Sequence, residues 1–548
     1  MKFKETIKQN YIKWILFAII ALVFDYIYFQ HHVILHSDDL IFHLNRFVEY
    51  NNSSIFHWPY ISTITFHHLG SQVNTYYPIQ SVYPIILLTK LTHHFVMSVY
   101  IYLTVFNFLS LILLDYVANS VFKNRLQSFA FSILYVFSSY HMIDFFKRFD
   151  IGEYIGMILI PVAFAGMYHI AKNERGKWQL ALAMTLMMYS HFLSVTMTSV
   201  VLGIAFIILM FTNSNRLQIL GDSVKEAVIT LGLTFWAWAP LLSHSLTNAK
   251  LVYPFEPKVM NGDNGFDQLN KIFTTDYTSF PTVGTLLFIS GALAIIWVFI
   301  RKQTPHVYRW LSLLAIFALW MTSSFFPWYI FKNTSVNKIQ FPSRVIIFAT
   351  LLLCIIVSYA ISHIGNIKLN HIFTYAVILI SCIYSLFAIQ QIYEAGTKEP
   401  NEIQNANITD QNYVAKATLE YYKDYMPKET DQSLDSLRAH QVKINNQIVP
   451  VNPKPGHNQI SYQFNTPTPN STVDVPVLNY SKHYQVVVND QNVPYKHSQR
   501  GTFLTKTHAK KNNVTVKYLP TFLDSYSWVI TLLFALGLTG FYTYRRKH

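Results

Sequence analysis

The chain has 548 residues, of which 52% are hydrophobic, 16% aromatic and only 13% charged. Soluble globular proteins carry about 25% charged residues, so this composition excludes an ordinary soluble domain and indicates a helical membrane protein. The net charge of +14 does not indicate nucleic-acid binding, because the basic residues cluster in short loops between apolar runs. Cys354 and Cys382 both lie inside apolar segments, which argues against a disulfide framework or a cysteine metal site.

Apolar runs long enough to cross a hydrocarbon core, about 20 residues, recur along the chain. The basic segment at the N-terminus precedes the first of them and has no small-residue cleavage site, so we interpret it as a retained anchor. About twelve transmembrane helices are predicted, at 12–30, 97–117, 127–144, 154–171, 178–190, 192–211, 225–246, 283–300, 308–326, 344–363, 371–392 and 525–542.

The basic loops place both termini in the cytoplasm. Lys147 and Arg148 contradict this rule, which points either to an error in the count of helices or to a functional pair. Residues 83–91 are apolar but too short to span, and they predict an interfacial or re-entrant helix. The outer face then carries the segments 31–96, 145–153, 247–282 and 393–524.

Region 393–524 differs from the rest because it is rich in Asn, Gln, Thr, Lys and Pro. Segments such as 484–488 and 513–518 are β-branched or alternating, and turn residues such as Asn489-Asp490 separate them. This pattern predicts a small, mostly β extracytoplasmic domain before the last helix. We therefore expect three parts: a transmembrane domain 1–392 with a first outer loop 31–96, the β-rich domain 393–524, and a last helix with a basic tail, 525–548.

The first outer loop contains the adjacent carboxylates Asp38 and Asp39. One of them could accept a proton while the other orients it or holds a cation. The alternative is a helix N-cap, which Ser37-Asp38-Asp39 also fits. His43 and Arg46 follow Asp39 at helical spacing, which favours a functional site.

Other candidates lie at the predicted outer ends of later helices. Arg148 and Glu153 can complete a polar site at the membrane surface, or form an ordinary solvated ion pair. His191 lies between two apolar runs, where a loop histidine is the simpler interpretation. Arg344, after Gln340-Phe-Pro-Ser, suits a lipid-linked phosphate because guanidinium binds phosphate through two parallel hydrogen bonds. Snorkelling at a helix end is the alternative.

Several common motifs are missing from the sequence. Neither HExxH nor a Walker A sequence occurs, and no GxGxxG precedes a helix. Nucleotide-driven export and dinucleotide chemistry are therefore disfavoured, and a structural zinc site has weak support.

The order of these motifs resembles bacterial membrane proteins described as 6-pyruvoyl-tetrahydropterin synthase-related, which are akin to the YfhO family. The resemblance covers nearly the whole chain and implies no pterin chemistry. It is carried by Asp39-x-x-Phe-His43-x-x-Arg46, Trp58-Pro59, Tyr76-Tyr-Pro78, Arg148-x-x-x-Gly-Glu153, Ser190-His191, Gln340-x-Pro-x-Arg344, Tyr422-x-x-Tyr-Met-Pro427 and Pro476-Val-Leu-Asn-Tyr480.

The family resembles glycosyltransferases of the GT-C superfamily, which implies an all-α polytopic fold with the β-rich domain appended. It also implies an enzyme of the bacterial cell membrane that moves a sugar from a polyprenyl-phosphate donor to a cell-envelope polymer or glycolipid on the outer face, with inversion. By position, Asp39 would be the base, with Asp38 and Glu153 as further catalytic acids. The substrate-binding residues would be His43, Arg46, Arg148, His191, Gln340 and Arg344.

A divalent metal ion is a possible cofactor, held by Asp39 and Glu153 if one binds. Two other functions stay open at this point. A flippase or transporter of a lipid-linked saccharide would need charges inside the spans, and Asp25 and Asp115 lie within apolar runs. A non-enzymatic scaffold for envelope assembly would use the β-rich domain for binding.

Overall fold

The computed structural model describes residues 2–54, 58–247, 250–252, 282–323, 325–339, 341–397, 407–417 and 424–547. The predicted site residue Gln340 and most of the predicted outer loop 247–282 lie outside these ranges. Two compact units are present. We call them the helical unit, made of Met1–Leu40, Leu87–Val228 and Phe255–Asp410, and the sandwich unit, made of Ile41–Ile86, Ile229–Pro254 and Gln411–His548.

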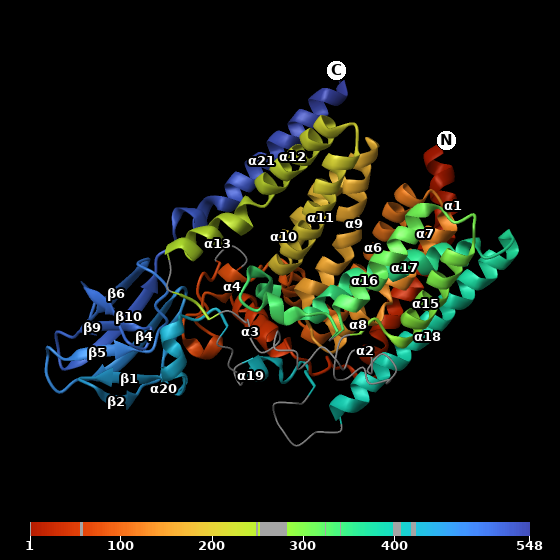
Figure 1. The fold of residues 1–548 in the computed structure, drawn as a ribbon. Helices are drawn as coiled ribbons and strands as arrows, with labels where there is room; N and C mark the ends of the chain where they lie inside the picture. Colours follow the sequence, from red (N-terminus) through yellow and green to blue (C-terminus); the bar gives the residue numbers. More distant parts are fainter. Residues whose placement is uncertain are drawn as a thin grey trace. The chain divides into compact units, whose positions relative to one another are not determined.

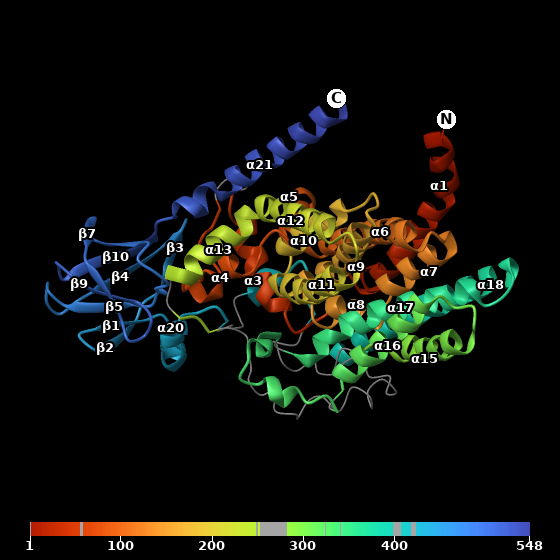
Figure 2. The same cartoon turned by 45° about the horizontal axis from the view of Figure 1, so that its top comes forward.

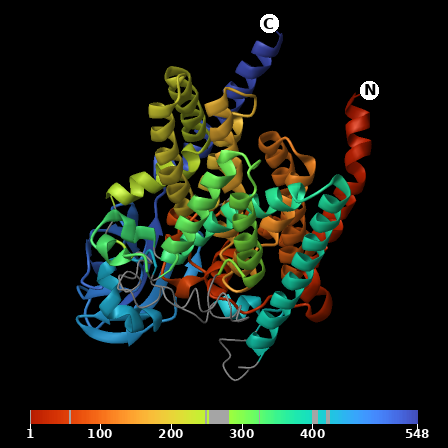
Figure 3. The same ribbon diagram turned by 45° about the vertical axis from the view of Figure 1, so that its right-hand side comes forward.

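The helical unit is a bundle of long apolar helices (Figure 1). In it α9 packs against α6, α8, α10 and α11, and α17 packs against α7, α15, α16 and α18. Figure 3 shows α18 in teal as one long helix. The bounds are α1 Lys2–Ala21, η1 Leu22–Asp25, α2 Tyr26–His31, α6 Phe95–Phe122, α7 Arg125–Val136, α8 Ser139–Phe146, α9 Ile151–Lys172, α10 Trp178–Met188, α11 Phe192–Thr212, α15 Thr285–Ile300, α16 His306–Met321, η4 Trp328–Phe331, η5 Ser335–Ile339, η6 Pro342–Val345, α17 Ile346–His363 and α18 Ile367–Thr397.

Within the described ranges, eight helical segments are long and apolar enough to cross a membrane. The number rises to nine if the pair Arg216–Leu233 and Phe235–Leu246, bent by 76°, is one broken span. The predicted span 178–190 falls on α10, and 283–300 and 308–326 fall on α15 and α16, but these helices have only 11, 16 and 16 residues. The prediction of a polytopic helical membrane protein is confirmed, with eight or nine full-length spans among twelve predicted ones.

The sandwich unit contains two five-stranded antiparallel sheets, drawn in blue in Figure 2. One has the order β2-β1-β5-β9-β8 and the other β3-β4-β10-β6-β7. Alternating residues such as Val473, Val475, Val514 and Val516 are fully buried and meet in one core, which confirms the predicted β-rich region. The strands are β1 Gln441–Ile444, β2 Gln447–Pro450, β3 Lys454–Gly456, β4 Gln459–Asn465, β5 Thr472–Val475, β6 Tyr484–Val488, β7 Gln491–Val493, β8 Tyr495–His497, β9 Phe503–Lys506 and β10 Lys511–Tyr518.

Helices complete the sandwich unit, and α13 packs against α21. The short helix predicted over 83–91 is present as α5, which joins the two units in sequence, as does α12. The division of the chain at 392 and 524 stays a prediction. The remaining elements are α3 Leu40–Asn51, η2 Phe66–His68, α4 Val73–Tyr76, α5 Tyr83–Thr92, α12 Arg216–Leu233, α13 Phe235–Thr247, α19 Tyr413–Ala417, η8 Lys428–Ser433, α20 Leu434–Arg438 and α21 Phe522–Lys547.

Inside the sandwich unit, α3 fixes the segment that follows it. The buried Glu49 carboxylate accepts hydrogen bonds from the backbone amides of Thr63, Ile64 and Thr65 and from the Thr65 hydroxyl. Asn45 accepts from the backbone amide of Phe66. A carboxylate that satisfies three successive amides substitutes for secondary structure, so this turn has one defined conformation.

Candidate functional site

The site begins where three helices of the helical unit start. Asp150 is the N-cap of α9 and accepts from the backbone amide of Glu153, His191 directly precedes α11, and Arg344 lies in η6 directly before α17. The side chains of these residues lie close together. Each helix N-terminus carries partial positive charge, so three such ends favour negatively charged groups here.

Two arginines share the Glu153 carboxylate. Arg344 forms an ion pair with Oε2 of Glu153, and Arg148 approaches the same oxygen at 3.2 Å. The other carboxylate oxygen accepts from the Tyr140 hydroxyl at 2.6 Å. Glu153 is fully buried, so it holds both guanidiniums in a low-dielectric setting where such bonds are strong.

Arg148 also connects two further acids. It lies 2.6 Å from Oδ1 of Asp144, four residues earlier, and 3.1 Å from Oδ2 of Asp150. Oδ2 of Asp144 is buried, and within the described residues it has no hydrogen-bond partner. The cluster therefore contains one buried carboxylate oxygen with unused acceptor capacity.

Asp39 adjoins this cluster through the backbone. Its amide donates to the carbonyl of Arg148 at 2.8 Å, and the amide of Asp38 donates to the carbonyl of Lys147 at 3.1 Å. The Asp39 side chain is partly buried. In contrast, the Asp38 carboxylate is 59% exposed and pairs with Lys147 at 3.3 Å. The two adjacent acids thus have different surroundings, as acid–base chemistry requires.

Burial raises the pKa of Asp39 to about 7, and repulsion from Asp150 and Asp38 adds to the effect while Arg148 and Arg344 oppose it. Burial also raises the pKa of Asp150, but interactions with His191, Arg148 and Arg344 and the hydrogen bond from the backbone amide of Glu153 outweigh burial and leave this pKa below its ordinary range. At neutral pH, Asp150 is ionised whereas Asp39 is close to its midpoint. A carboxyl with a pKa near the working pH is suited to act as a general base.

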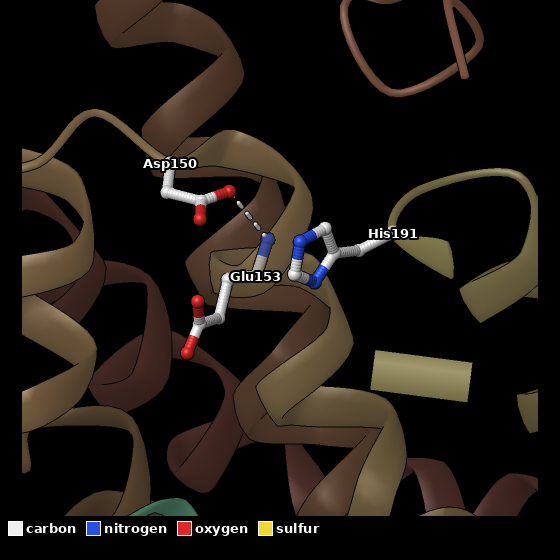
Figure 4. Close-up of side chains that lie close together, drawn as sticks. All are labelled: Asp150, Glu153 and His191. Carbon is white, nitrogen blue, oxygen red and sulfur yellow. Dashed lines mark hydrogen bonds between the residues drawn. The ribbon is translucent and has the colours of Figure 1, made fainter. Parts of the chain in front are cut away.

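Figure 4 shows Asp150, Glu153 and His191 close together, with Asp150 hydrogen-bonded to the backbone amide of Glu153. His191 is buried, and burial lowers its pKa even though Asp150 opposes the change, so the ring is neutral at pH 7. Its Nδ1 lies 2.8 Å from the Ser194 hydroxyl. Ser194 has room because residue 156 is glycine: a Cβ there would lie 2.6 Å from the Ser194 Oγ.

The donor set fits a divalent cation. Asp150, Glu153 and His191 each offer one ligand atom, and these atoms lie within 4.8 Å of one another. The cluster around them has four carboxylates, those of Asp39, Asp144, Asp150 and Glu153, and two guanidiniums, which leaves two negative charges in excess when all are ionised. Buried charge without compensation is costly, and either protons or a divalent cation would relieve it.

The structure brings some predicted site residues together and places others elsewhere. Arg148, Glu153, His191 and Arg344 meet in the helical unit beside Asp39. The Asp38 side chain is exposed to solvent and forms an ion pair with Lys147. Among the residues predicted to hold a metal, Glu153 is in the three-residue donor set.

His43 and Arg46 belong to the sandwich unit. The Arg46 guanidinium is fully buried and donates to Asn74 and to the carbonyls of Tyr77 and Pro78, and its Nη1 lies 3.2 Å from Nδ1 of His43. These bonds tie α3 to the end of α4. Substrate binding by His43 and Arg46 stays a prediction.

Sequence reasoning missed Asp144, Asp150 and Tyr140. Asp144 is the last residue of the span predicted over 127–144, and Asp150 falls in the predicted outer segment 145–153. A signal for Asp144 was present, because Asp144 and Arg148 are four residues apart, the spacing of ion pairs along a helix. Tyr140 contacts Glu153 from α8, a long-range contact that carries no local signal.

No protein-family model matches the chain, and no curated protein matches it. Among solved structures, the arabinofuranosyltransferase AftD from Mycobacteria, determined by single-particle cryo-EM, is similar to this chain with a TM-score of 0.49 and 12% sequence identity. The match covers 94% of this chain and 40% of that one, so this chain spans less than half the length of AftD. At this score and identity, the likeness carries no conclusion about the activity of this chain.

Proposed function

We propose that the protein is a membrane glycosyltransferase that moves a sugar from a polyprenyl-phosphate donor to a cell-envelope glycan or glycolipid at the outer face of a bacterial membrane. The observation that carries the proposal is a pair of guanidiniums, the half-buried Arg148 and the buried Arg344, where three spans begin. Guanidinium groups and helix N-termini together suit a phosphate group. The sequence resemblance to GT-C enzymes supports the same activity.

In the proposed reaction, Asp39 accepts the proton of the acceptor hydroxyl. The acceptor oxygen forms a bond to the anomeric carbon as the bond from that carbon to the phosphate oxygen breaks, and the polyprenyl phosphate leaves with the electron pair. Attack from the face opposite the phosphate inverts the configuration, through an oxocarbenium-like transition state. A single base is enough because phosphate is already a good leaving group.

Arg344 and Arg148 would stabilise the negative charge that grows on the departing phosphate. Both hold the Glu153 carboxylate, so a phosphate would replace part of that contact. Asp150, Glu153 and His191 would hold a divalent cation, which would supply further charge stabilisation at the phosphate. His191 and Ser194 would keep the donor side of the site in a fixed orientation.

The test uses the purified full-length chain in proteoliposomes that contain a polyprenyl-phosphate sugar, with envelope glycans as acceptors and sugar transfer as the readout. Arg344→Lys keeps the charge but loses the planar two-point grip on phosphate. We expect it to lower kcat/KM by about 10- to 100-fold. The exposed Arg175 in the loop after α9 provides the matched control, because Arg175→Lys should leave transfer unchanged. Normal transfer by Arg344→Lys would contradict the proposal.

The same vesicles test a transporter. A transporter would use acidic residues inside the spans, and Asp25 and Asp115 lie there. However, Asp115 pairs with Lys13 and Asp25 accepts a hydrogen bond from Thr104, so one oxygen of each carboxylate already has a partner within the bundle. Movement of the lipid-linked sugar across the vesicle without transfer would favour transport. Absence of both activities with every acceptor would favour a scaffold.

A further inference from the structure

Three histidines with an unusual backbone conformation belong to the sandwich unit. His67 and His68 end the turn that Glu49 fixes, and His440 directly precedes β1. All three have left-handed backbone, with φ of 55°, 54° and 49°. Residues other than glycine rarely adopt this conformation, and such residues gather at ligand-binding positions.

The rings of His68 and His440 lie close to the separation that a shared metal ion requires. Their centres are 5.8 Å apart. With Zn–N bonds of about 2.0–2.1 Å, two imidazoles on one tetrahedral ion have ring centres roughly 5 Å apart. The observed spacing therefore needs a shift of less than about 1 Å to admit an ion.

The hydrogen bond of His68 selects the tautomer that binds metal. Its Nδ1 lies 2.8 Å from the carbonyl oxygen of Thr63, and because a carbonyl only accepts, Nδ1 carries the proton and Nε2 carries the lone pair. Metal-binding histidines almost always donate their second ring nitrogen in this way. Nδ1 of His440 is buried and, in the described part of the chain, has no hydrogen-bond partner.

The surrounding structure holds this arrangement in place. Glu49 accepts from the backbone amide of Thr63 at 2.9 Å, and the Thr63 hydroxyl donates to the carbonyl of Gly456 in β3 at 3.0 Å. The carbonyl that orients His68 is thus fixed from α3 and from the β-sandwich. A rigid second shell of this kind is what a metal site needs for affinity.

We propose that His68 and His440 form a binding site for a borderline divalent transition metal, with Zn²⁺ as the first candidate. Neutral imidazole prefers Zn²⁺, Cu²⁺ and Ni²⁺ to Mg²⁺ and Ca²⁺. The ion cross-links the first outer loop to the β-sandwich. The site is separate from the donor set of Asp150, Glu153 and His191 and does not depend on the proposed transferase activity.

The experiment measures Zn²⁺ uptake by the purified full-length protein after removal of metal with a chelator. His440→Asn and His68→Asn remove one imidazole each, and asparagine tolerates the left-handed backbone better than other residues. The exposed His497 in β8, at the far edge of the same sheet as β1, gives the control His497→Asn. An Asp150→Asn background removes the contribution of the carboxylate site.

In the Asp150→Asn background, we expect the parent protein and the His497→Asn variant to bind one Zn²⁺ that raises the thermal midpoint. In the same background, His440→Asn and His68→Asn should bind Zn²⁺ at least tenfold more weakly. Equal Zn²⁺ affinity in His440→Asn and the control would overturn the proposal. If the variants do not fold, zinc-edge X-ray absorption on Asp150→Asn decides: at least two imidazole ligands support the site, and an oxygen-only shell overturns it.

Discussion

Asp38 and Asp39 offer a matched pair for testing the general base, since the same substitution can be made at two adjacent residues with different surroundings. The pKa of Asp39 is raised from 3.8 to about 7, so the carboxylate form that accepts a proton is lost as the pH falls below 7. In proteoliposomes, kcat/KM for sugar transfer should fall about tenfold per pH unit on the acid side, to about 1% of its plateau at pH 5. Asp39→Asn should lower the plateau by about 10²- to 10⁴-fold.

Asp38→Asn is the control. Asp38 is 59% exposed and its partner is Lys147, and an exposed ion pair contributes at most about 1 kcal/mol, so its loss should change the plateau by less than about fivefold. Asp38 also raises the pKa of Asp39, so Asp38→Asn should move the acid limb to lower pH. The reasoning fails if both variants lose activity equally, or if the wild-type acid limb lies near pH 4.

Three further predictions concern the free energy of unfolding, measured by thermal and denaturant unfolding of the purified protein. In each case the control is a variant with the same amino-acid change at an exposed position. Glu153→Gln leaves two guanidiniums without their shared carboxylate and should cost about 3–5 kcal/mol; an unchanged midpoint would contradict this. Gly156→Ala places a Cβ 2.6 Å from the Ser194 hydroxyl and should cost about 1–3 kcal/mol, which a wild-type midpoint would refute. Asp474→Asn weakens the buried pair with Arg500 and should lower the unfolding midpoint of the β-sheet signal in circular dichroism, and a loss confined to the helical signal would show the explanation to be wrong.

The fold could be predicted from the sequence where it depends on local composition. Apolar length located the predicted spans on helical segments, although the span predicted over 225–246 falls on two helices bent by 76°. The β-branched alternation located the sandwich. The ends of helices were harder to predict. The span predicted over 308–326 ends at Met321, whose carbonyl accepts from the indole of Trp328. The end of this helix therefore involves a hydrogen bond from a side chain seven residues away, and the hydropathy of the sequence does not reveal such a bond.

The local composition of the sequence also predicts part of the candidate site. Glu153 and Arg344 are candidates in the sequence because polar residues at the ends of apolar runs stand out, whereas a loop residue is the simpler interpretation of His191 there. Their meeting follows from three spans starting at one place in the helical unit. The hydrogen-bond partners of Arg46 could not be predicted, because Asn74 and Pro78 lie 28 and 32 residues further along the chain.

The sharing of Glu153 by two arginines has a consequence for any anion that enters. The two guanidiniums are already paired with the Glu153 carboxylate, so an incoming anion must displace it. The binding free energy of the anion is therefore only the difference between two strong ionic interactions. Stray sulfate or inorganic phosphate gains little from such an exchange, whereas a ligand held elsewhere by a long lipid tail can complete it. In the proposed transfer, the Glu153 carboxylate would return to both guanidiniums when the phosphate leaves.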